Sequence, residues 1–410
     1  MLVIGKGLIT ITAENKRKTY GDPNPALTYT YNGFVNGETL ATSGITGTPV
    51  ISTEVNQQTG AGEYDIVLSS GTLNAGNYVI QFIKGKFTVD KAPLTVIAQN
   101  KSRLYGQPNP EFTVTYNGFV NNESLASSGI LGTPELGTPA TATSPAAEYV
   151  IKAGNGTLQS NNYVFSFIDA KLTIGKAALK LTVDNKTKTY GDANPEFTVT
   201  YNGFANGEVF SSGSVIGSLN FITDANTNSA AGQSEVRIDP ASLFSDKYEL
   251  SFASGQLTIA KVMLSIKAED KSRTYGVSNP PLTFTYNGFV NGENLSSSGV
   301  TGLPVLSTTA NQLSGAGTYD ISITKGNLAA ANYDFQVSKA TLTIDRAALM
   351  VSASAQTRKY GTSNSTVNWS LNYNGFANGE NLQSSDVKGA PAFTTDRKST
   401  RLNSSHGYIS

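Results

Sequence analysis

Cysteine is absent from this sequence of 410 residues, and charge of either sign is scarce. Without cysteine there can be no disulfide, thiolate metal site or cysteine nucleophile, although the absence is compatible with either an exported or a cytosolic protein. The 30 Lys and Arg residues balance the 30 Asp and Glu residues, and charged residues make up only 15% of the chain. No basic field is therefore available for nucleic acid or an anionic membrane, and neither is expected as a partner.

Long apolar runs and histidine are also lacking. No run approaches the roughly 20 residues of a membrane span, and Met1 is not followed by the basic and then apolar segments of a signal peptide. The one histidine is His406, so the many serines and threonines lack a base that could activate them as nucleophiles. We expect a protein that is not an enzyme, with no catalytic, cofactor-binding or metal-binding residues and no cofactor.

Repetition is what the sequence has in abundance. The segment YNGFVNGE begins at Tyr31 and returns, with at most one change, at Tyr116, Tyr201, Tyr286 and Tyr373. A Tyr-Gly pair recurs every 85 residues, at Tyr20, Tyr105, Tyr190, Tyr275 and Tyr360. Such a period indicates tandem modules. We expect complete repeats at 8–92 (repeat 1), 93–177 (repeat 2), 178–262 (repeat 3) and 263–347 (repeat 4), then a truncated repeat 5 at 348–395. Residues 1–7 look like the last strand of a repeat that is otherwise missing.

Within a repeat, apolar residues alternate with polar ones. In EFTVTYNGF, Phe112, Val114 and Tyr116 alternate with threonines, which is typical of a half-buried strand. Similar segments predict five or six short strands per repeat, giving a mainly β fold of modules in series, like beads on a string. The Asn-Gly of YNGF predicts a tight hairpin turn. The following NGETLATSG leaves room for a short helix, capped by Asn36 and with Glu38 in its first turn.

These motifs together resemble a known family. The Tyr-Gly-x-x-Asn-Pro loop, the Tyr-x-Gly-Phe-x-x-Gly-Glu segment and the closing β-segments are similar to the MBG-type (YGX) repeats of large bacterial cell-surface proteins. The resemblance implies a small, β-grasp-like module in an exported, adhesin-like protein at the cell surface, and it supplies no catalytic residues. Repeat 3 departs from the pattern, with IGSLN at Ile216 to Asn220 and AAGQSEVRI further on, so its middle loop should differ in shape.

Some recurring polar residues are candidate ligands. The glutamates Glu38, Glu123, Glu208, Glu293 and Glu380 could serve as ligands or acids, but a place in the first turn of a helix explains them. Asp22 and Asp192 lie in the Tyr-Gly loop, where a calcium ligand might be sought. The same positions hold Gln107, Val277 and Thr362, so no shared calcium site is expected. The Tyr31 position could stack on sugars, but the alternation places it on the apolar face of its strand.

Two functions from different classes fit this organisation. Framework positions repeat, whereas the loops EVNQQTGAGE, PATATSPAAE, DANTNSAAGQ and ANQLSGAGT share little. We therefore expect a structural stalk, whose surface ligand, glycan or protein partner would be bound by other domains; the alternative is a directly adhesive or glycan-binding array, with a hydrolase a distant third. Junctions such as VDKAPLTV contain no flexible linker, so one repeat should pass almost directly into the next, as a stiff and monomeric array.

The C-terminal end breaks the pattern. From Asp396 to Ser410 the chain resembles the translation of a common short-read sequencing adapter, which would make His406 foreign to the protein. Repeat 5 keeps its Tyr360-Gly361 loop and its Tyr373 turn but lacks its closing strands. Because a β-module without those strands has half a core, we expect residues 348–395 to be poorly packed and the tail to form no regular structure.

Overall fold

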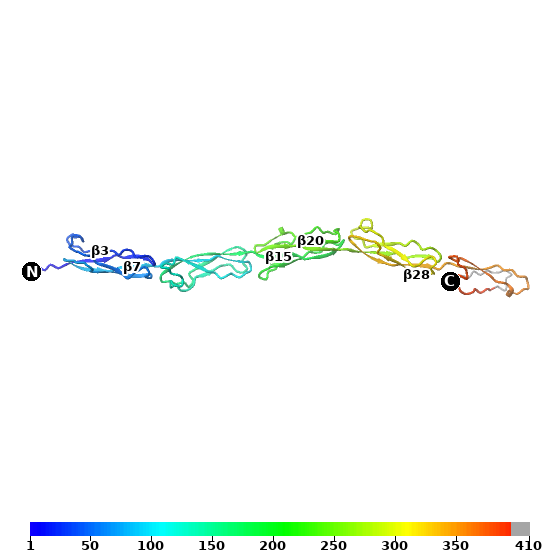
Figure 1. The fold of residues 1–410 in the computed structure, drawn as a ribbon, viewed down its shortest axis with the longest axis horizontal. Helices are drawn as coiled ribbons and strands as arrows, with labels where there is room; N and C mark the ends of the chain where they lie inside the picture. The colour runs from blue at the N-terminus through cyan, green and yellow to red at the C-terminus, as the bar shows by residue number, and fades with distance from the viewer. Residues whose placement is uncertain (395–410) are drawn as a thin grey trace. The chain divides into compact units, whose positions relative to one another are not determined.

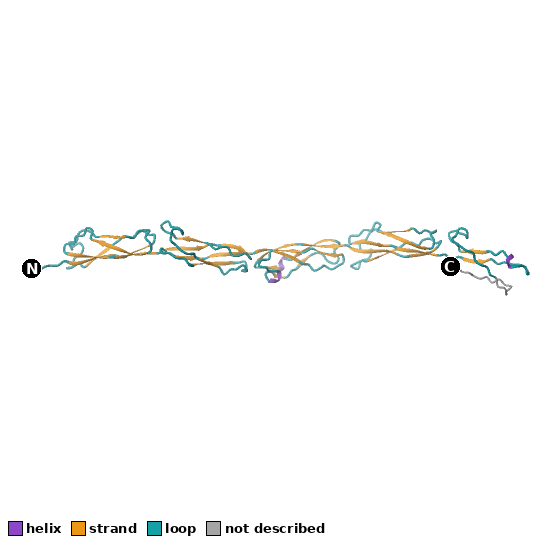
Figure 2. Ribbon diagram, turned by 90° about the horizontal axis from the view of Figure 1, so that it is seen from below, coloured by secondary structure: helices purple, strands orange, loops and turns teal. Residues whose placement is uncertain are grey.

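The computed structural model describes residues 1–394, and the predictions for the tail and for His406 lie outside the described residues. Short strands and turns make up this part of the chain, with three short 3₁₀-helices and no α-helix (Figure 2). The mainly β fold is thus confirmed. The described residues also contain no helix with the length and hydrophobicity needed to cross a membrane.

The chain divides into two compact units. Unit 1 holds residues 1–181, 201–219 and 240–251, and unit 2 holds 182–200, 220–239 and the described residues from 252 onward. Repeats 1 and 2 therefore belong to unit 1, repeat 4 and residues 348–394 belong to unit 2, and the division passes through repeat 3.

Repeat 1 consists of two sheets, in which the labelled strands β3 and β7 belong to different sheets (Figure 1). The first sheet has the order β3-β1-β6 and the second the order β2-β7-β5-β4. The strands are β1 Gly7–Ala13, β2 Lys16–Thr19, β3 Tyr29–Asn32, β4 Val50–Thr53, β5 Gly62–Ser69, β6 Tyr78–Ile83 and β7 Gly85–Asp90. Two of the changes of sheet need only one or two residues: β1 ends at Ala13 and β2 begins at Lys16, and β6 ends at Ile83 and β7 begins at Gly85.

Repeats 2 and 4 have the same plan. Repeat 2 contains β8 Ala92–Ala98, β9 Lys101–Leu104, β10 Val114–Asn117, β11 Glu135–Gly137, β12 Glu148–Gly154, β13 Tyr163–Ile168 and β14 Ala170–Gly175. Repeat 4 contains β24 Val262–Ala268, β25 Lys271–Thr274, β26 Phe284–Asn287, β27 Val305–Thr308, β28 Gly317–Thr324, β29 Tyr333–Ser338 and β30 Ala340–Asp345.

Repeat 3 differs in its middle loop, as predicted. Its strands are β15 Ala177–Val183, β16 Lys186–Thr189, β17 Val199–Asn202, β18 Ile216–Gly217, β19 Phe221–Ile222, β20 Gly232–Ile238, β21 Leu243–Phe244, β22 Tyr248–Ala253 and β23 Gly255–Ala260, with 3₁₀-helices at Phe210–Ser212 and Pro240–Ser242. The pair β18–β21 replaces the single bridge, Thr46 with Asn74, found at this place in repeat 1.

Residues 348–394 form much less structure. They contain β31 Met350–Ala353 paired with β32 Leu371–Asn374, and a 3₁₀-helix at Asn364–Thr366. No side chain among residues 348–394 is buried. The expectation that this segment is poorly packed is confirmed, and within the described residues no strand follows β32 that could close its core.

The cores follow the predicted alternation. Along β1, Ile9 and Ile11 are fully buried, while Thr10 between them is partly exposed. Tyr31 is partly buried against the same core, as its place on the apolar face predicted.

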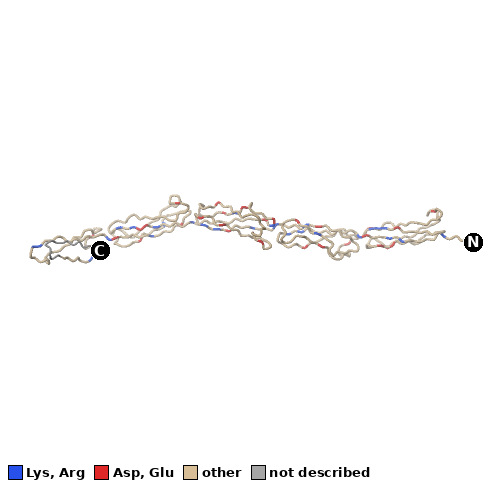
Figure 3. Tube along the Cα trace, turned by 180° about the vertical axis from the view of Figure 1, so that it is seen from behind, with Lys and Arg blue, Asp and Glu red and all other residues tan. Residues whose placement is uncertain are grey.

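On the surface, Lys and Arg are interspersed with Asp and Glu (Figure 3). Pairs such as Lys86–Glu63, at 2.7 Å, are exposed, so they add little stability.

Two local predictions fail at the YNGFVNGE segment. No hairpin forms at Asn32-Gly33, because β3 ends there and the next strand, β4, belongs to the other sheet. Instead Gly33, with φ of 101°, lets the chain pass close to β1, where a Cβ would lie 2.5 Å from the carbonyl oxygen of Leu8. The two residues with left-handed backbone are Asn36 and Gly37, with φ of 49° and 70°.

That left-handed turn also excludes the predicted helix. A helix-capping residue has an extended backbone, and Asn36 does not. Residues 36–44 form turns in repeat 1, and only repeat 3 contains a 3₁₀-helix in the equivalent segment, at Phe210–Ser212. Glu38 therefore has no helix dipole to complement, and its role must come from other contacts.

Candidate functional site: the joint between neighbouring repeats

Complete repeats follow one another without a linker. The last strand of repeat 1, β7, ends at Asp90 and the first strand of repeat 2, β8, begins at Ala92. The single residue between them, Lys91, donates a hydrogen bond from Nζ to the carbonyl oxygen of Ser160, 2.7 Å away in repeat 2. The predicted direct passage between repeats is confirmed. This boundary, with the residues on both sides, is called the joint.

A glutamate shared by two tyrosines lies at the centre of the joint. Tyr20 of repeat 1 donates its hydroxyl proton to Oε1 of Glu123 in repeat 2, and Tyr163 of repeat 2 donates to Oε2, both at 2.5 Å. The two tyrosine rings meet edge to face at 5.7 Å. Both oxygens of the carboxylate are thus used, one by each repeat.

All four joints contain the same bond across the boundary. Tyr105 donates to Glu208 at 2.7 Å and Tyr190 donates to Glu293 at 2.6 Å, while Tyr275 donates to Glu380. The first two joints lie within unit 1 and the other two within unit 2. At the first three joints a second tyrosine also binds the glutamate: Tyr163, Tyr248 and Tyr333.

The glycine of each Tyr-Gly pair lets the two repeats approach closely. Gly21 has φ of 88°, and a Cβ there would lie 2.6 Å from the Cβ of Val120 in repeat 2. Equivalent contacts join Gly106 to Ala205, Gly191 to Val290 and Gly276 to Ala377. The glycine is therefore required twice, for its left-handed backbone and for the space that the next repeat occupies.

The variable loops also touch the next repeat, but through their backbone. The amide of Ala61 donates to Oδ1 of Asn162 at 3.0 Å, and the Asn206 side chain donates to the carbonyl oxygen of Ala142 at 3.3 Å. A buried cation holds each loop from within its own repeat, as Lys18 does by donating to the carbonyl oxygen of Asn56. Because backbone atoms make these contacts, the loop sequences can vary without loss of the joint.

Apolar packing crosses the first joint as well. One buried cluster combines Phe87 and Val89 of repeat 1 with Leu94 and Tyr163 of repeat 2, and Tyr20 belongs to it. Burying such side chains supplies most of the favourable free energy of folding. The joint is therefore part of a core and not a contact between two finished surfaces.

Electrostatics favour the ionised form of Glu208 and the protonated forms of Tyr163 and Tyr333. Burial together with the hydrogen bond to Glu123 raises the pKa of Tyr163 to about 12, and the equivalent surroundings raise the pKa of Tyr333 to about 12. Burial alone would raise the pKa of Glu208, but hydrogen bonds from Tyr248 and Tyr105, among others, outweigh it and lower that pKa to about 2. Lys247 adds an ion pair to Glu208 at 3.2 Å.

The structure gives the candidate metal ligands other surroundings. Asp22 uses its backbone: its amide donates to the carbonyl oxygen of Thr19, and its carbonyl oxygen accepts from Lys18. Within residues 1–394 there is no group of three or more His, Cys, Asp or Glu side chains arranged to hold a metal ion.

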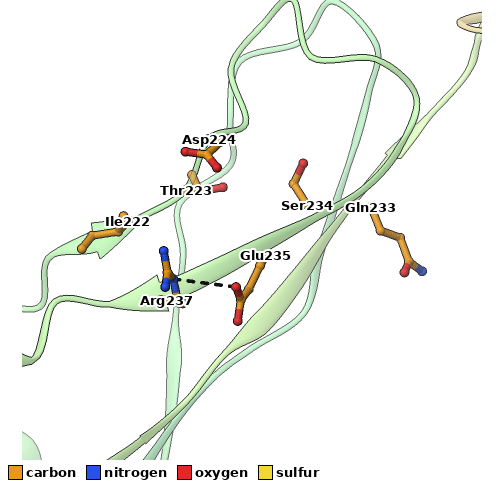
Figure 4. A pocket seen from close by; sticks show the side chains of 7 residues that line it. All are labelled: Ile222, Thr223, Asp224, Gln233, Ser234, Glu235 and Arg237. Carbon is orange, nitrogen blue, oxygen red and sulfur yellow. Dashed lines mark ion pairs between the residues drawn. The ribbon is translucent and has the colours of Figure 1, made fainter.

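One polar hollow lies away from the joints, in repeat 3. It measures about 280 Å³ and is lined by Ile222, Thr223, Asp224, Gln233, Ser234, Glu235 and Arg237 (Figure 4). Arg237 and Glu235 face each other at 3.7 Å. One repeat period away, Arg237 corresponds to Lys152 and Ser322. Because its lining changes from repeat to repeat, the hollow is not a shared binding site.

Sequence reasoning found the residues of the joint but not their role. Tyr20 and Glu123 are 103 residues apart, so no local pattern connects them. The available signal was that the Tyr-Gly pair and the glutamate recur together in every repeat, as two halves of one contact would.

Comparison with known proteins supports this organisation. Residues 9–88, 94–173, 179–258 and 264–343 each match the MBG domain (YGX type), and the chain belongs to this family. No curated protein matches the chain.

Two solved structures are distant matches. Drosophila N-cadherin EC1-3 has a TM-score of 0.18 and 8% identity, with 61% of this chain and 98% of that chain covered. Three N-terminal domains of the bacteriophage RB49 Highly Immunogenic Outer Capsid protein (Hoc) also have a TM-score of 0.18, with 9% identity and 73% and 99% covered.

Proposed function

We propose that this chain is a non-catalytic stalk segment of a bacterial, adhesin-like surface protein. The repeats would hold a binding domain away from the cell, and ligands would be bound by domains outside this segment. The observation that carries the proposal is the joint, which recurs at four boundaries with the same tyrosine, glycine and glutamate. A spacer needs each boundary to be fixed in the same way, whereas an enzyme needs one site built once.

The adhesive alternative has less support. An array that binds its ligand directly should present the same exposed side chains in each repeat. The recurring tyrosines and glutamates are instead used between repeats, and the variable loops contribute backbone atoms. Extracellular location and a monomeric state belong to the same proposal.

Small-angle X-ray scattering on the whole chain tests the stalk. A compact unit of 85 residues has a diameter of roughly 30 Å, so four units in line should reach a maximum dimension on the order of 120 Å. The scattering should also give the mass of a single chain. A maximum dimension of about 50 Å, expected for one sphere of that size, would rule out the stalk.

A further inference from the structure

In each repeat the beginning and the end of the chain lie side by side as parallel neighbours. In repeat 1 the leading segment, residues 7–19, contains β1 and β2, and the trailing segment, residues 78–90, contains β6 and β7. Gly7 pairs with Tyr78, and Thr19 pairs with Asp90. In both pairs the two partners are the same number of residues apart in the sequence, although the first pair lies in one sheet and the second in the other. Two sheets thus share one parallel register.

The other repeats keep this register. In repeat 2, Ala92 pairs with Tyr163 and Leu104 pairs with Gly175. In repeat 4, Val262 pairs with Tyr333 and Thr274 pairs with Asp345. In unit 2, repeat 3 has the same offset, from Lys186 with Leu257 to Thr189 with Ala260.

A side chain continues the pairing where the leading segment changes sheet. Between β1 and β2 the amide of Glu14 turns away and donates to the carbonyl oxygen of Thr28. The amide of Lys86 in the trailing segment then donates to Oδ1 of Asn15, at 2.8 Å. The same bond, at the same distance, is accepted by Asn100, Asn185 and Asp270 in the next three repeats. Asp can replace Asn here because the position only accepts a hydrogen bond.

One strand of each segment is also paired on its other edge, whereas β2 and β6 are edge strands. β1 lies between β3 and β6, and β7 lies between β2 and β5. The chain enters the repeat at the start of β1 and leaves at the end of β7, through Lys91. A force along the chain therefore pulls two parallel neighbours in opposite directions, against hydrogen bonds that run across the strands. The hydrogen bonds between the leading and trailing segments must then break at the same time.

We propose that each repeat is a force-bearing clamp in which the leading and trailing segments are loaded in shear, with Asn15 and its equivalents closing the gap at the sheet change. This deepens the proposed stalk function, on which it rests for the source of the force. The test of the clamp measures the force at which a single repeat unfolds, and this force does not depend on the dimensions of the array. The two proposals can therefore fail separately.

Single-molecule force spectroscopy on the whole chain provides the test, because a chain without cysteine accepts handles at chosen residues. In the shear geometry, Lys6→Cys and Lys91→Cys carry the handles of repeat 1. In the matched peeling geometry, Lys6→Cys and Asn77→Cys pull apart the same register from one end, where the amide of Gly7 binds the carbonyl oxygen of Asn77. The chain from Lys6 to Lys91 is about 300 Å long when fully stretched. Unfolding of repeat 1 should therefore lengthen the tether by this length minus the folded distance between the two handles.

The clamp predicts a higher unfolding force in shear than in peeling, by roughly twofold or more at the same loading rate. Equal forces in the two geometries would overturn it. Asn15→Leu should lower the shear force of repeat 1, whereas Asn15→Asp should keep it, because Asp270 accepts the same hydrogen bond in repeat 4. If Asn15→Leu keeps the full force, the side chain has no part in the clamp; if it prevents folding, the two handle geometries of the unchanged repeat still decide.

Discussion

Tyr20 and Tyr360 occupy the same position in their repeats, yet their surroundings are opposite. Tyr20 is 4% exposed at the joint with repeat 2, whereas Tyr360 is fully exposed. Their glycines differ in the same way, since a Cβ on Gly21 would meet Val120 and a Cβ on Gly361 would meet nothing within 4 Å among the described residues. The Tyr-Gly loop therefore owes its burial to the following repeat.

The glutamates give the complementary comparison. Glu123 accepts hydrogen bonds from Tyr20 and Tyr163, whereas Glu38 of repeat 1 accepts one only from Tyr78 of its own repeat, within the described part of the chain. Each motif is thus half of a contact. The following experiments separate what a repeat contributes by itself from what the joint adds.

Core truncation should show the largest difference between a complete repeat and residues 348–394. Phe87 is fully buried, so Phe87→Ala should destabilise repeat 1 by about 3–5 kcal/mol. Leu349→Ala should lower the stability by about 1 kcal/mol or less, because Leu349 is itself partly exposed. Hydrogen exchange followed peptide by peptide would measure both. Similar losses at the two positions would mean that repeat 5 has a core of its own.

Alanine at the two glycines should isolate the joint. The left-handed backbone costs about 1–2 kcal/mol in both Gly21→Ala and Gly361→Ala. Only Gly21→Ala also pushes against Val120, which adds typically 1–3 kcal/mol. Calorimetric unfolding of the two variants gives the difference directly. Equal losses would show that the close approach of Gly21 and Val120 contributes nothing.

Removing the charge of the shared glutamate should have a moderate effect. Glu208→Gln weakens charge-assisted bonds from Tyr105, Tyr248 and Lys247, for a loss of about 1.5–3 kcal/mol. Glu38→Gln, with one tyrosine partner, should lose less. Urea denaturation of each variant against the unchanged chain measures the two losses, and an equal or larger effect at Glu38 would contradict the shared role.

The loss at Glu208 should depend on pH. Since its pKa is lowered from 4.5 to about 2 in the folded chain, its stabilisation is present above pH 4.5 and disappears as the pH falls toward 2. The difference in urea midpoint between the chain and Glu208→Gln should therefore shrink across this range. A difference that stays constant down to pH 2 would show that the carboxylate charge is not what matters.

The smallest effect concerns tyrosine ionisation. Because the pKa of Tyr163 is raised from 10.0 to about 12, its stabilisation is present below pH 10 and is lost as the pH rises toward 12. Glu123→Gln removes one cause of that rise and also one cause of the raised pKa of Tyr20, so the tyrosinate absorbance should include two groups that ionise at lower pH. An unchanged titration curve would indicate that burial alone sets the pKa of Tyr163.

Some features of the fold were readable from single segments. Alternation of apolar residues identified β1 and its equivalents, and the absence of a linker at VDKAPLTV predicted the direct step from β7 to β8. At the YNGFVNGE segment the same local reasoning failed, since it assigned the turn to the first Asn-Gly pair and a helix to the second. The close approach of Gly33 to Leu8, which a local pattern does not contain, decided the first case.

The sequence by itself determined the period of 85 residues, the β character of each repeat and the exposure of residues 348–394, because these depend on local alternation and on which strands are present. Only the tertiary structure decided what Tyr20 and Glu123 do, and that Asn15 completes a register. Their partners are 103 and 71 residues distant, and no local preference encodes such a pairing. It arises when two strands that are far apart in the chain come to lie side by side.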